Sequence, residues 1–235
     1  METYERLTLE HRGRVLWITI AGKTPMNPVD AALHHDLARV FYDAQTDPDS
    51  DVVVLTGSGK AFCAGGDMDW FREMMDDPRK FRDIATEAKR IVFGLLDLEK
   101  PIVCRLNGAA AGLGATIALL CDIIVADDKA VIGDPHVKMG LVAGDGGAVI
   151  WPQLIGYARA KEFLLTGDLV PAPRAADMGL INYAVPTEEL DAKVDELARK
   201  LVNGAKWPGR RTQTSANSPL PALAHKLMDT PSTYD

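Results

Sequence analysis

The sequence lacks the patterns that mark a zinc site, a membrane span, a secretory leader or a nucleic-acid surface. Its three cysteines, Cys63, Cys104 and Cys121, are far apart, and none has a cysteine or histidine partner at zinc-ligand spacing. No run approaches the ~20 apolar residues of a membrane span, and the acidic first residues are unlike a signal peptide. The net charge of −7 gives no general attraction to polyanions. We therefore expect a cytoplasmic protein with reduced thiols and without bound metal, nucleic acid or membrane.

Apolar residues make up 47% of the 235 residues, which is enough for a sizeable core in one large or two small domains. Strand-like and helix-like runs alternate through the first half. Strands are expected at 14–20, 51–56, 102–106, 123–126 and 130–132, and helices at 28–44, at 78–96 and up to 121. Because parallel strands need a long crossover, which a helix supplies, this alternation predicts an α/β fold with parallel strands.

Beyond residue 147 the patterns are mainly helical. Helices are expected near 148–154, 158–165, 172–178 and 188–203. The tail from Lys206 contains Trp207-Pro208-Gly209 and further prolines at 219, 221 and 231. Because proline interrupts a helix interior, we expect this tail to be poorly ordered or docked elsewhere.

A glycine-dense loop follows the second predicted strand. It reads Gly57-Ser58-Gly59-Lys60-Ala61-Phe62-Cys63-Ala64-Gly65-Gly66-Asp67. Glycines let the backbone approach a ligand and expose N–H donors. The loop has neither the Gly-Lys-Ser/Thr ending of a phosphate-binding loop nor Gly-x-Gly-x-x-Gly spacing, so nucleotide phosphate is disfavoured. An ordinary strand–helix turn stays open as the alternative.

A second turn of small residues leads from the strand at 102–106 into a helix. It reads Asn107-Gly108-Ala109-Ala110-Ala111-Gly112-Leu113-Gly114. The free N–H groups at a helix start point at whatever precedes the helix. Donors from two such loops can converge on one oxygen and form an oxyanion hole, which favours a charge that develops in the transition state.

Together these motifs closely resemble the crotonase (enoyl-CoA hydratase/isomerase) family. The resemblance rests on the ordered motifs at 61–67, 101–114, 121–126, 140–147 and 165–167, and it covers roughly residues 5 to 205. It implies an α/β fold of the crotonase type, with a ββα-spiral core over residues 1–200 and a shortened, proline-broken helical tail over residues 201–235. It also implies an acyl-CoA substrate, no permanently bound cofactor besides the substrate's own coenzyme A, and a homotrimer or hexamer.

The resemblance also assigns residues to the site. The oxyanion donors are the backbone N–H groups of Gly66 and Leu113. The adenine of coenzyme A lies against the backbone of the segment Lys60-Ala61-Phe62-Cys63-Ala64, with Asp67 ordering the loop. From the residues alone, Asp67 is equally well explained as the cap of the helix that follows it.

The resemblance weakens at the positions where hydratases of this family carry two glutamates that position and activate water. Aligned on the motifs, these positions are Thr116 and His136. A threonine cannot act as a general base near neutral pH, whereas an imidazole with an ordinary pKa of ~6.5 can accept or donate a proton. We therefore expect ordinary water addition to be impaired or to use other groups.

Asp145, in Gly144-Asp145-Gly146-Gly147, resembles the acidic position at which family isomerases place their proton-shuttling glutamate. It is the best candidate for a general base or acid, because one carboxylate can carry a proton between two carbons of an enolate. The alternative is a cap for the helix from Gly146. Asp134 shares a face with His136 in an extended segment, and close approach would raise the imidazole pKa. Trp151 either lines an acyl pocket or belongs to the core.

These residues predict an enzyme in which Gly66 and Leu113 stabilise a thioester enolate and Asp145 transfers a proton, assisted by His136 or Thr116. Isomerase-type proton transfer is favoured. A specialised hydratase, hydrolase or carbon–carbon lyase stays open, because the departures lie where the reaction type is decided. A non-catalytic acyl-CoA-binding protein is the alternative from a different class.

Overall fold

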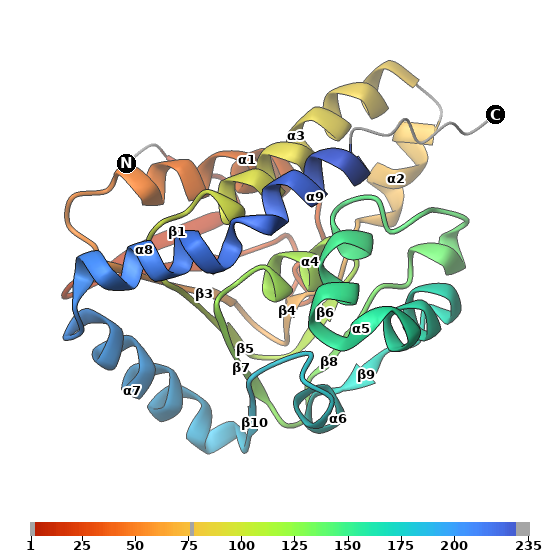
Figure 1. Cartoon of the computed structure of the whole chain (residues 1–235). Coiled ribbons are helices and arrows are strands. Elements are labelled where there is room, and N and C mark those ends of the chain that lie inside the picture. Colours follow the sequence, from red (N-terminus) through yellow and green to blue (C-terminus); the bar gives the residue numbers. More distant parts are fainter. Residues whose placement is uncertain (1–2, 76–77, 229–235) are drawn as a thin grey trace.

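Two β-sheets organise the chain in the computed structural model, which describes residues 3–75 and 78–228 (Figure 1). The strands are β1 (Leu7–Arg12), β2 (Val15–Ile20), β3 (Val52–Gly57), β4 (Ala61–Cys63), β5 (Ile102–Leu106), β6 (Ala109–Ala111), β7 (Ile123–Asp127), β8 (Val131–Gly133), β9 (Val170–Pro171) and β10 (Tyr183–Val185). The helices are α1 (Ala31–Thr46), α2 (Met68–Met75), α3 (Pro78–Leu96), α4 (Leu113–Leu119), α5 (Gly147–Thr166), α6 (Ala172–Asp177), α7 (Leu190–Val202), α8 (Lys206–Asn217) and α9 (Pro219–Met228), with 3-10 turns η1 (His136–Met139) and η2 (Thr187–Glu189).

The larger sheet has the strand order β1-β2-β3-β5-β7-β10, and the smaller one β4-β6-β8-β9. All neighbouring pairs in these sheets are parallel except β1 with β2 and β8 with β9. Each repeat of the chain adds one strand to the large sheet, then one to the small sheet, then a helix: β3-β4-α2, β5-β6-α4 and β7-β8-α5. The predicted α/β fold with parallel strands and ββα repeats is therefore confirmed.

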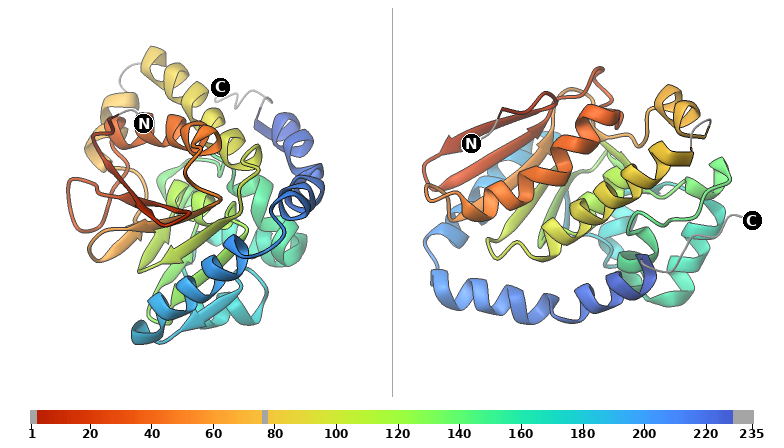
Figure 2. Two further views of the ribbon diagram at one scale, coloured as in Figure 1. Left: turned by 90° about the vertical axis from the view of Figure 1, so that its left-hand side faces the viewer. Right: turned by 90° about the horizontal axis from the view of Figure 1, so that it is seen from above.

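Both faces of the large sheet are covered by helices (Figure 2). One face packs against α7 through the strand residues Trp17, Val54, Val103 and Val125. The other face joins the main core with α1 and α3, and every residue of β3 is buried. This burial on both faces explains why β3 is a continuous apolar run rather than an alternating one.

The predicted helix at 28–44 begins three residues later in the structure, at Ala31. Its N-cap is Asp30, whose carboxylate accepts a hydrogen bond from the N–H of Leu33 at 2.9 Å. The two helices expected at 148–154 and 158–165 form α5, which is kinked at Gly156 with φ 78° and ψ 159°. The structure also contains β1, β4, β6, β9, β10 and α2, which the apolar patterns did not predict.

Of the two outcomes expected for the tail, poor order is wrong for residues 206–228 and docking is confirmed, because these residues form α8 and α9. Pro208 is the third residue of α8, and Pro219 and Pro221 are the first and third residues of α9. The N–H groups of a first helical turn have no acceptor within the helix, so a proline there removes no hydrogen bond. The prolines thus begin these helices, while Pro231 lies outside the described residues.

Both tail helices are docked on the core. In α8, the side-chain amide of Gln213 donates to the carbonyl of Leu98 and to the carboxylate of Asp122, each at 2.9 Å. In α9, His225 lies against Phe93 of α3 with ring centroids 4.2 Å apart. Among the described residues, no helix is long and apolar enough to cross a membrane.

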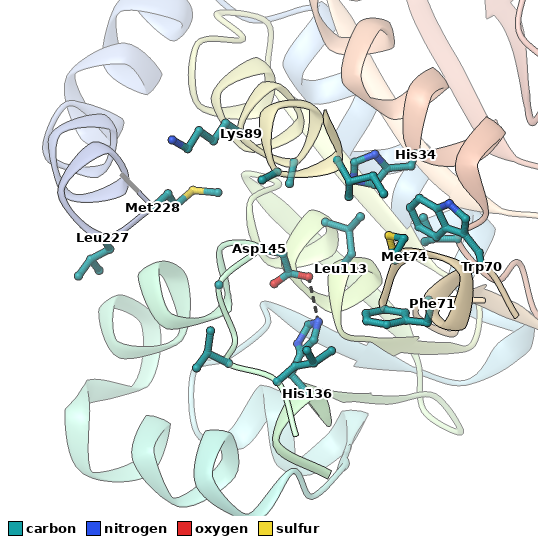
Figure 3. A pocket seen from close by; sticks show the side chains of 18 residues that line it. His34, Trp70, Phe71, Met74, Lys89, Leu113, His136, Asp145, Leu227 and Met228 are labelled. Atoms are coloured by element: carbon teal, nitrogen blue, oxygen red, sulfur yellow. Dashed lines mark ion pairs between the residues drawn. The ribbon is translucent and has the colours of Figure 1, made fainter. Parts of the chain in front are cut away.

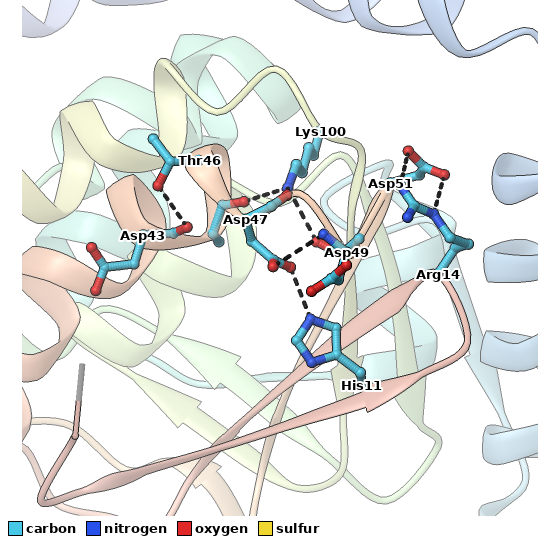
Figure 4. Close-up of polar contacts among 10 residues, drawn as sticks. His11, Arg14, Asp43, Thr46, Asp47, Asp49, Asp51 and Lys100 are labelled. Carbon is cyan, nitrogen blue, oxygen red and sulfur yellow. Dashed lines mark hydrogen bonds and ion pairs between the residues drawn. The ribbon is translucent and has the colours of Figure 1, made fainter. Parts of the chain in front are cut away.

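A buried lysine links the C-terminal end of α1 to β5, the strand that leads into the second donor loop (Figure 4). Lys100, just before β5, is 2% exposed. Its ammonium donates to the carbonyls of Ala44 and Asp47 at 2.6 and 2.5 Å and to the hydroxyl of Ser50 at 3.1 Å. Burial lowers the pKa of Lys100, while Asp47 opposes this effect. The contacts satisfy carbonyl groups of the last turn and C-cap of α1, where carbonyls have no N–H partner further along the helix.

Candidate active site

Two donor loops meet where the small sheet ends. β4 and β6 are parallel neighbours, so the loops that leave them lie at the same edge. Gly65 has φ 97°, and a Cβ there would lie 3.3 Å from the carbonyl oxygen of Ala111 in the other loop. Gly112 has φ 52°, and a Cβ there would lie 3.2 Å from Cε1 of His136. Glycine is needed at both positions for the backbone conformation and for this close approach.

Gly66 and Leu113 both line a pocket in front of these loops. Leu113 is the first residue of α4, so its N–H has no acceptor within the helix. Within the part of the chain that the structure describes, no backbone acceptor for the N–H of Gly66 or Leu113 is found in the turns and loops. The predicted oxyanion donors therefore lie at one cavity with their N–H groups available.

The pocket is largely apolar and has a volume of about 350 Å³ (Figure 3). Its lining residues are Val29, His34, Gly66, Trp70, Phe71, Met74, Ile84, Ala85, Ala88, Lys89, Leu113, His136, Leu141, Val142, Gly144, Asp145, Leu227 and Met228. Trp151 is absent from this set and fully buried, so it belongs to the core. Pockets of this size and character bind organic ligands through apolar contacts and a few placed polar groups.

Two titratable side chains, His136 and Asp145, lie at the pocket wall, and a third, Asp134, is buried beside His136. Nε2 of His136 lies 3.4 Å from a carboxylate oxygen of Asp145. Nδ1 of the same ring makes a short hydrogen bond to Asp134, which is 1% exposed. Burial opposes protonation of the ring, but Asp145 and Asp134 outweigh this effect and raise the pKa of His136 to about 9. The imidazole is thus held in its charged form between two carboxylates at neutral pH.

Thr116 and Asp145, which the sequence analysis proposed for the same site, are in contact. The Thr116 hydroxyl, on the fully buried helix α4, donates to Asp145 at 3.3 Å. Burial raises the pKa of Asp145 and Asp134 adds to this, while His136, the N–H of Gly147 and Thr116 oppose it. The alternative that Asp145 is the N-cap of α5 is wrong, because that N-cap is Gly146; Asp145 precedes it and accepts a hydrogen bond from the N–H of Gly147.

The same three side chains are close enough to be considered as metal ligands, and the structure shows direct contacts among them. Ligand atoms of Asp134, His136 and Asp145 lie within 4.8 Å of one another, as a metal site would require. The ring of His136, however, lies between the two carboxylates, with one nitrogen facing each. An ion bound at one ring nitrogen would replace the direct contact on that side, while the other nitrogen could keep its carboxylate partner.

The residues predicted to contact coenzyme A lie outside the pocket lining. Ala61 and Phe62 are fully buried in β4, and the side chain of the buried Asn27 donates to their carbonyl oxygens at 2.9 and 3.2 Å. The N–H groups of Lys60 and Ala64 bond to the carbonyls of residues 25 and 26 at 2.8 and 3.0 Å. Asn27 therefore shapes this loop, and it was missed because a lone asparagine carries no periodic signal.

Asp67 caps the helix after the loop. Its carboxylate accepts hydrogen bonds from the N–H groups of Asp69 at 2.9 Å and Trp70 at 3.1 Å. This matches the capping alternative and places the side chain at the start of α2, beside Gly66.

His34 is a site residue that sequence reasoning missed. It is 3% exposed and lines the pocket from α1. The helical pattern in this segment was attributed to apolar positions such as Leu33 and Leu37. A signal was present, because Leu37, Ala38 and Phe41 follow His34 at helical spacing and place it on a buried face.

Comparison with known proteins gives one consistent result. The family model for enoyl-CoA hydratase/isomerase matches residues 10–223. The crotonyl-CoA hydratase of Syntrophomonas wolfei is 31% identical over 220 residues, which cover 91% of this chain and 82% of the relative. The short-chain-enoyl-CoA hydratase of Clostridium acetobutylicum is 34% identical over 200 residues, which cover 84% and 75%.

Solved structures agree with the sequence comparison. The crystal structure of an enoyl-CoA hydratase/isomerase from Mycobacterium paratuberculosis superimposes with a TM-score of 0.91 at 32% identity, covering 95% of this chain and 89% of that chain. The ββα repeats and the two donor loops match the features expected of the family to which these relatives belong. The chain therefore has the crotonase fold and belongs to the enoyl-CoA hydratase/isomerase family of enzymes.

Proposed function

We propose that this enzyme binds an enoyl-CoA thioester and moves its double bond by proton transfer through an enolate. The observation that carries the proposal is the meeting of two available backbone donors, from Gly66 and Leu113, with the carboxylate of Asp145 in one apolar pocket. The donors would hold the thioester oxygen as negative charge develops on it. The carboxylate would supply the acid–base chemistry next to that oxygen.

In the proposed reaction, Asp145 removes a proton from the carbon between the thioester carbonyl and a 3,4 double bond. The electron pair of the broken C–H bond shifts into the dienolate, whose charge rests on the thioester oxygen at the two donors. The protonated Asp145 then returns its proton to C4, which leaves a 2,3 double bond. The raised pKa of Asp145 favours this step, because a carboxylate with a higher pKa is a stronger base.

His136 and Thr116 would act through Asp145. Since the pKa of His136 is about 9, the ring is charged at neutral pH and cannot serve as the base. Its charge lies 3.4 Å from Asp145 and keeps part of that carboxylate ionised. The hydroxyl of Thr116 orients the other oxygen. Both residues are therefore proposed to position and tune the base.

Hydration of a 2-enoyl-CoA is the second candidate. It is supported by relatives named crotonyl-CoA hydratase and short-chain-enoyl-CoA hydratase. Addition of water needs a base for the water and an acid for the α-carbon, and the pair Asp145 and His136 offers one group of each kind. The absence of both expected glutamates, replaced by Thr116 and His136, is the reason that isomerisation is preferred.

The remaining features of the substrate and assembly follow the family resemblance. We propose that the adenine of coenzyme A lies against the backbone of residues 60–64, beside Asp67, that the enzyme assembles as a homotrimer or hexamer, and that it acts in the cytoplasm. Light scattering after size-exclusion chromatography measures the assembly. Crosslinking with a photoreactive CoA analogue, followed by peptide mapping, tests the position of the adenine.

One experiment separates the candidate reactions. The enzyme is incubated in deuterium oxide with a 3-enoyl-CoA and, separately, with a 2-enoyl-CoA, and the products are identified by mass and ultraviolet absorbance. Isomerisation predicts a 2-enoyl product from the first substrate, with deuterium exchanged at carbon. A hydroxyacyl product from the second substrate would favour hydration instead. Thioester binding with neither product nor exchange would favour the non-catalytic alternative.

A further inference from the structure

A second histidine faces the pocket and takes no part in the proton-transfer chain. His34 lies in the second turn of α1, is 3% exposed, and lines the cavity together with Gly66 and Trp70. In Figure 3, His34 and His136 lie on opposite sides of Leu113. The acyl part of a bound thioester would therefore have an imidazole at each side.

The ring of His34 is held in a fixed orientation by Glu87 of α3. Nδ1 of His34 lies 2.8 Å from a carboxylate oxygen of Glu87. The bond to His34, against the effect of burial and with help from His35, lowers the pKa of Glu87 to about 2. The carboxylate is therefore ionised and can only accept, so Nδ1 carries the hydrogen and donates it. The second nitrogen, Nε2, is left for another partner.

No described residue supplies that partner. Among residues 3–75 and 78–228, Glu87 is the hydrogen-bonding neighbour found for His34, and the nearest ring is that of Trp70 at 5.4 Å between centroids. The surrounding pocket wall is apolar, with Val29, Phe71 and Met74. Among the described residues, Nε2 of His34 is not one of the side-chain atoms that are both fully buried and without a partner, so this nitrogen is open to the cavity, where a polar ligand group can reach it.

We propose that His34 is a substrate-binding residue that recognises a hydroxyl group on the acyl chain. The inference rests on the proposed function, since the pocket must first hold the acyl part of a thioester. Nε2 accepts a hydrogen bond when the ring is neutral and donates one when it is charged. A hydroxyl group both donates and accepts, so it satisfies Nε2 in either state, whereas a carbonyl group fits only the charged ring.

Binding measurements test the inference without requiring turnover. Titration calorimetry is performed with saturated acyl-CoA thioesters that carry one hydroxyl group at successive carbons from C3 onward, each compared with the unsubstituted thioester. At one position, the wild-type protein should bind the hydroxylated thioester tenfold or more tightly than the unsubstituted one. In His34→Leu this preference should disappear, while the unsubstituted thioester should bind at least as tightly as before.

His35 offers a matched control. Its Nδ1 also lies 2.8 Å from Glu87, but the side chain is 57% exposed and does not line the pocket. His35→Leu should keep the hydroxyl preference, and so should His34→Gln, which retains a donor and an acceptor. Circular dichroism confirms that each variant folds, and if His34→Leu does not fold, loss of the preference in His34→Phe is the corresponding result.

The outcomes are distinct. The inference is overturned if no hydroxylated thioester is preferred by the wild-type protein, or if the preference survives in folded His34→Leu. If neither hydroxylated nor unsubstituted thioesters bind, the proposed function is refuted. The role of His34, which depends on that function, is then refuted as well.

Discussion

Replacing Asp145 by asparagine should lower the pKa of His136, and this effect can be measured without any substrate. The change removes a negative charge 3.4 Å from Nε2 of His136. At that distance two unit charges interact by about 1.2 kcal/mol in bulk water and by about 5 kcal/mol at an effective dielectric constant of about 20. Since 1.36 kcal/mol corresponds to one pH unit, the pKa of His136 should fall from about 9 by at least about one pH unit.

The assay is an NMR titration of the histidine ring signals, assigned with His136→Gln. Asp168→Asn is the matched control, because its carboxylate pairs with the exposed Lys138 at 3.2 Å and is not part of the His136 chain. The control should leave the titration of His136 unchanged. If Asp145→Asn also leaves it unchanged in the folded protein, Asp145 does not hold the charge of this ring, and the electrostatic argument for the site is refuted.

Four further outcomes are expected. Asp145→Asn should lower turnover by ~100-fold or more while thioester binding persists, and His136→Gln should lower turnover less. If His136→Gln loses turnover and Asp145→Asn keeps it, histidine is the base. Gly66→Pro removes one oxyanion donor, so kcat should fall by a factor of ~100 or more in protein that circular dichroism shows to be folded; full activity would place the oxyanion elsewhere. Lys100→Met should lower the free energy of unfolding, measured with urea, by about 2–3 kcal/mol, since its carbonyl acceptors lose a charged donor; an unchanged value would contradict this role. Because the pKa of His136 is raised, its stabilisation is complete below pH ~6.5 and is lost as the pH rises through about 9, so urea midpoints should fall over this window, and less so in His136→Gln.

The order of elements in the core could be predicted because the relevant signals are local. β3 and β5 are short apolar runs bounded by glycine and proline, and α3 has a clear helical period. β1 was missed although its pairing with β2 is regular, because only two of its six residues, Leu7 and Leu9, are large and apolar. In the small sheet, β4, β6 and β9 were missed because they have only two or three residues each, which is too few for a periodic signal, whereas β8 was predicted within one residue.

Part of the site was predictable because some of its contacts are also local in the sequence. Asp134 and His136 are two residues apart and their expected contact is confirmed, but the expected extended segment is wrong, because His136 begins the 3-10 turn η1. The contact of His136 with Asp145 and that of Asp145 with Thr116 join separate segments, and they were inferred only through the family resemblance. His34 reaches Glu87 across 53 residues, and no local pattern relates the two. Such contacts form when the chain crosses over and returns to the same region of the fold. No short stretch of the sequence reveals them.

The helix α9 has a consequence for how this enzyme could be altered. Its residues Leu227 and Met228 form part of the pocket wall, next to α3 and α5. Asp134, His136 and Asp145 come from a different segment, between β8 and α5. One part of the cavity wall therefore comes from a segment that carries none of these three side chains. Exchange of one terminal helix can change which acyl group fits, while the acid–base groups keep their surroundings.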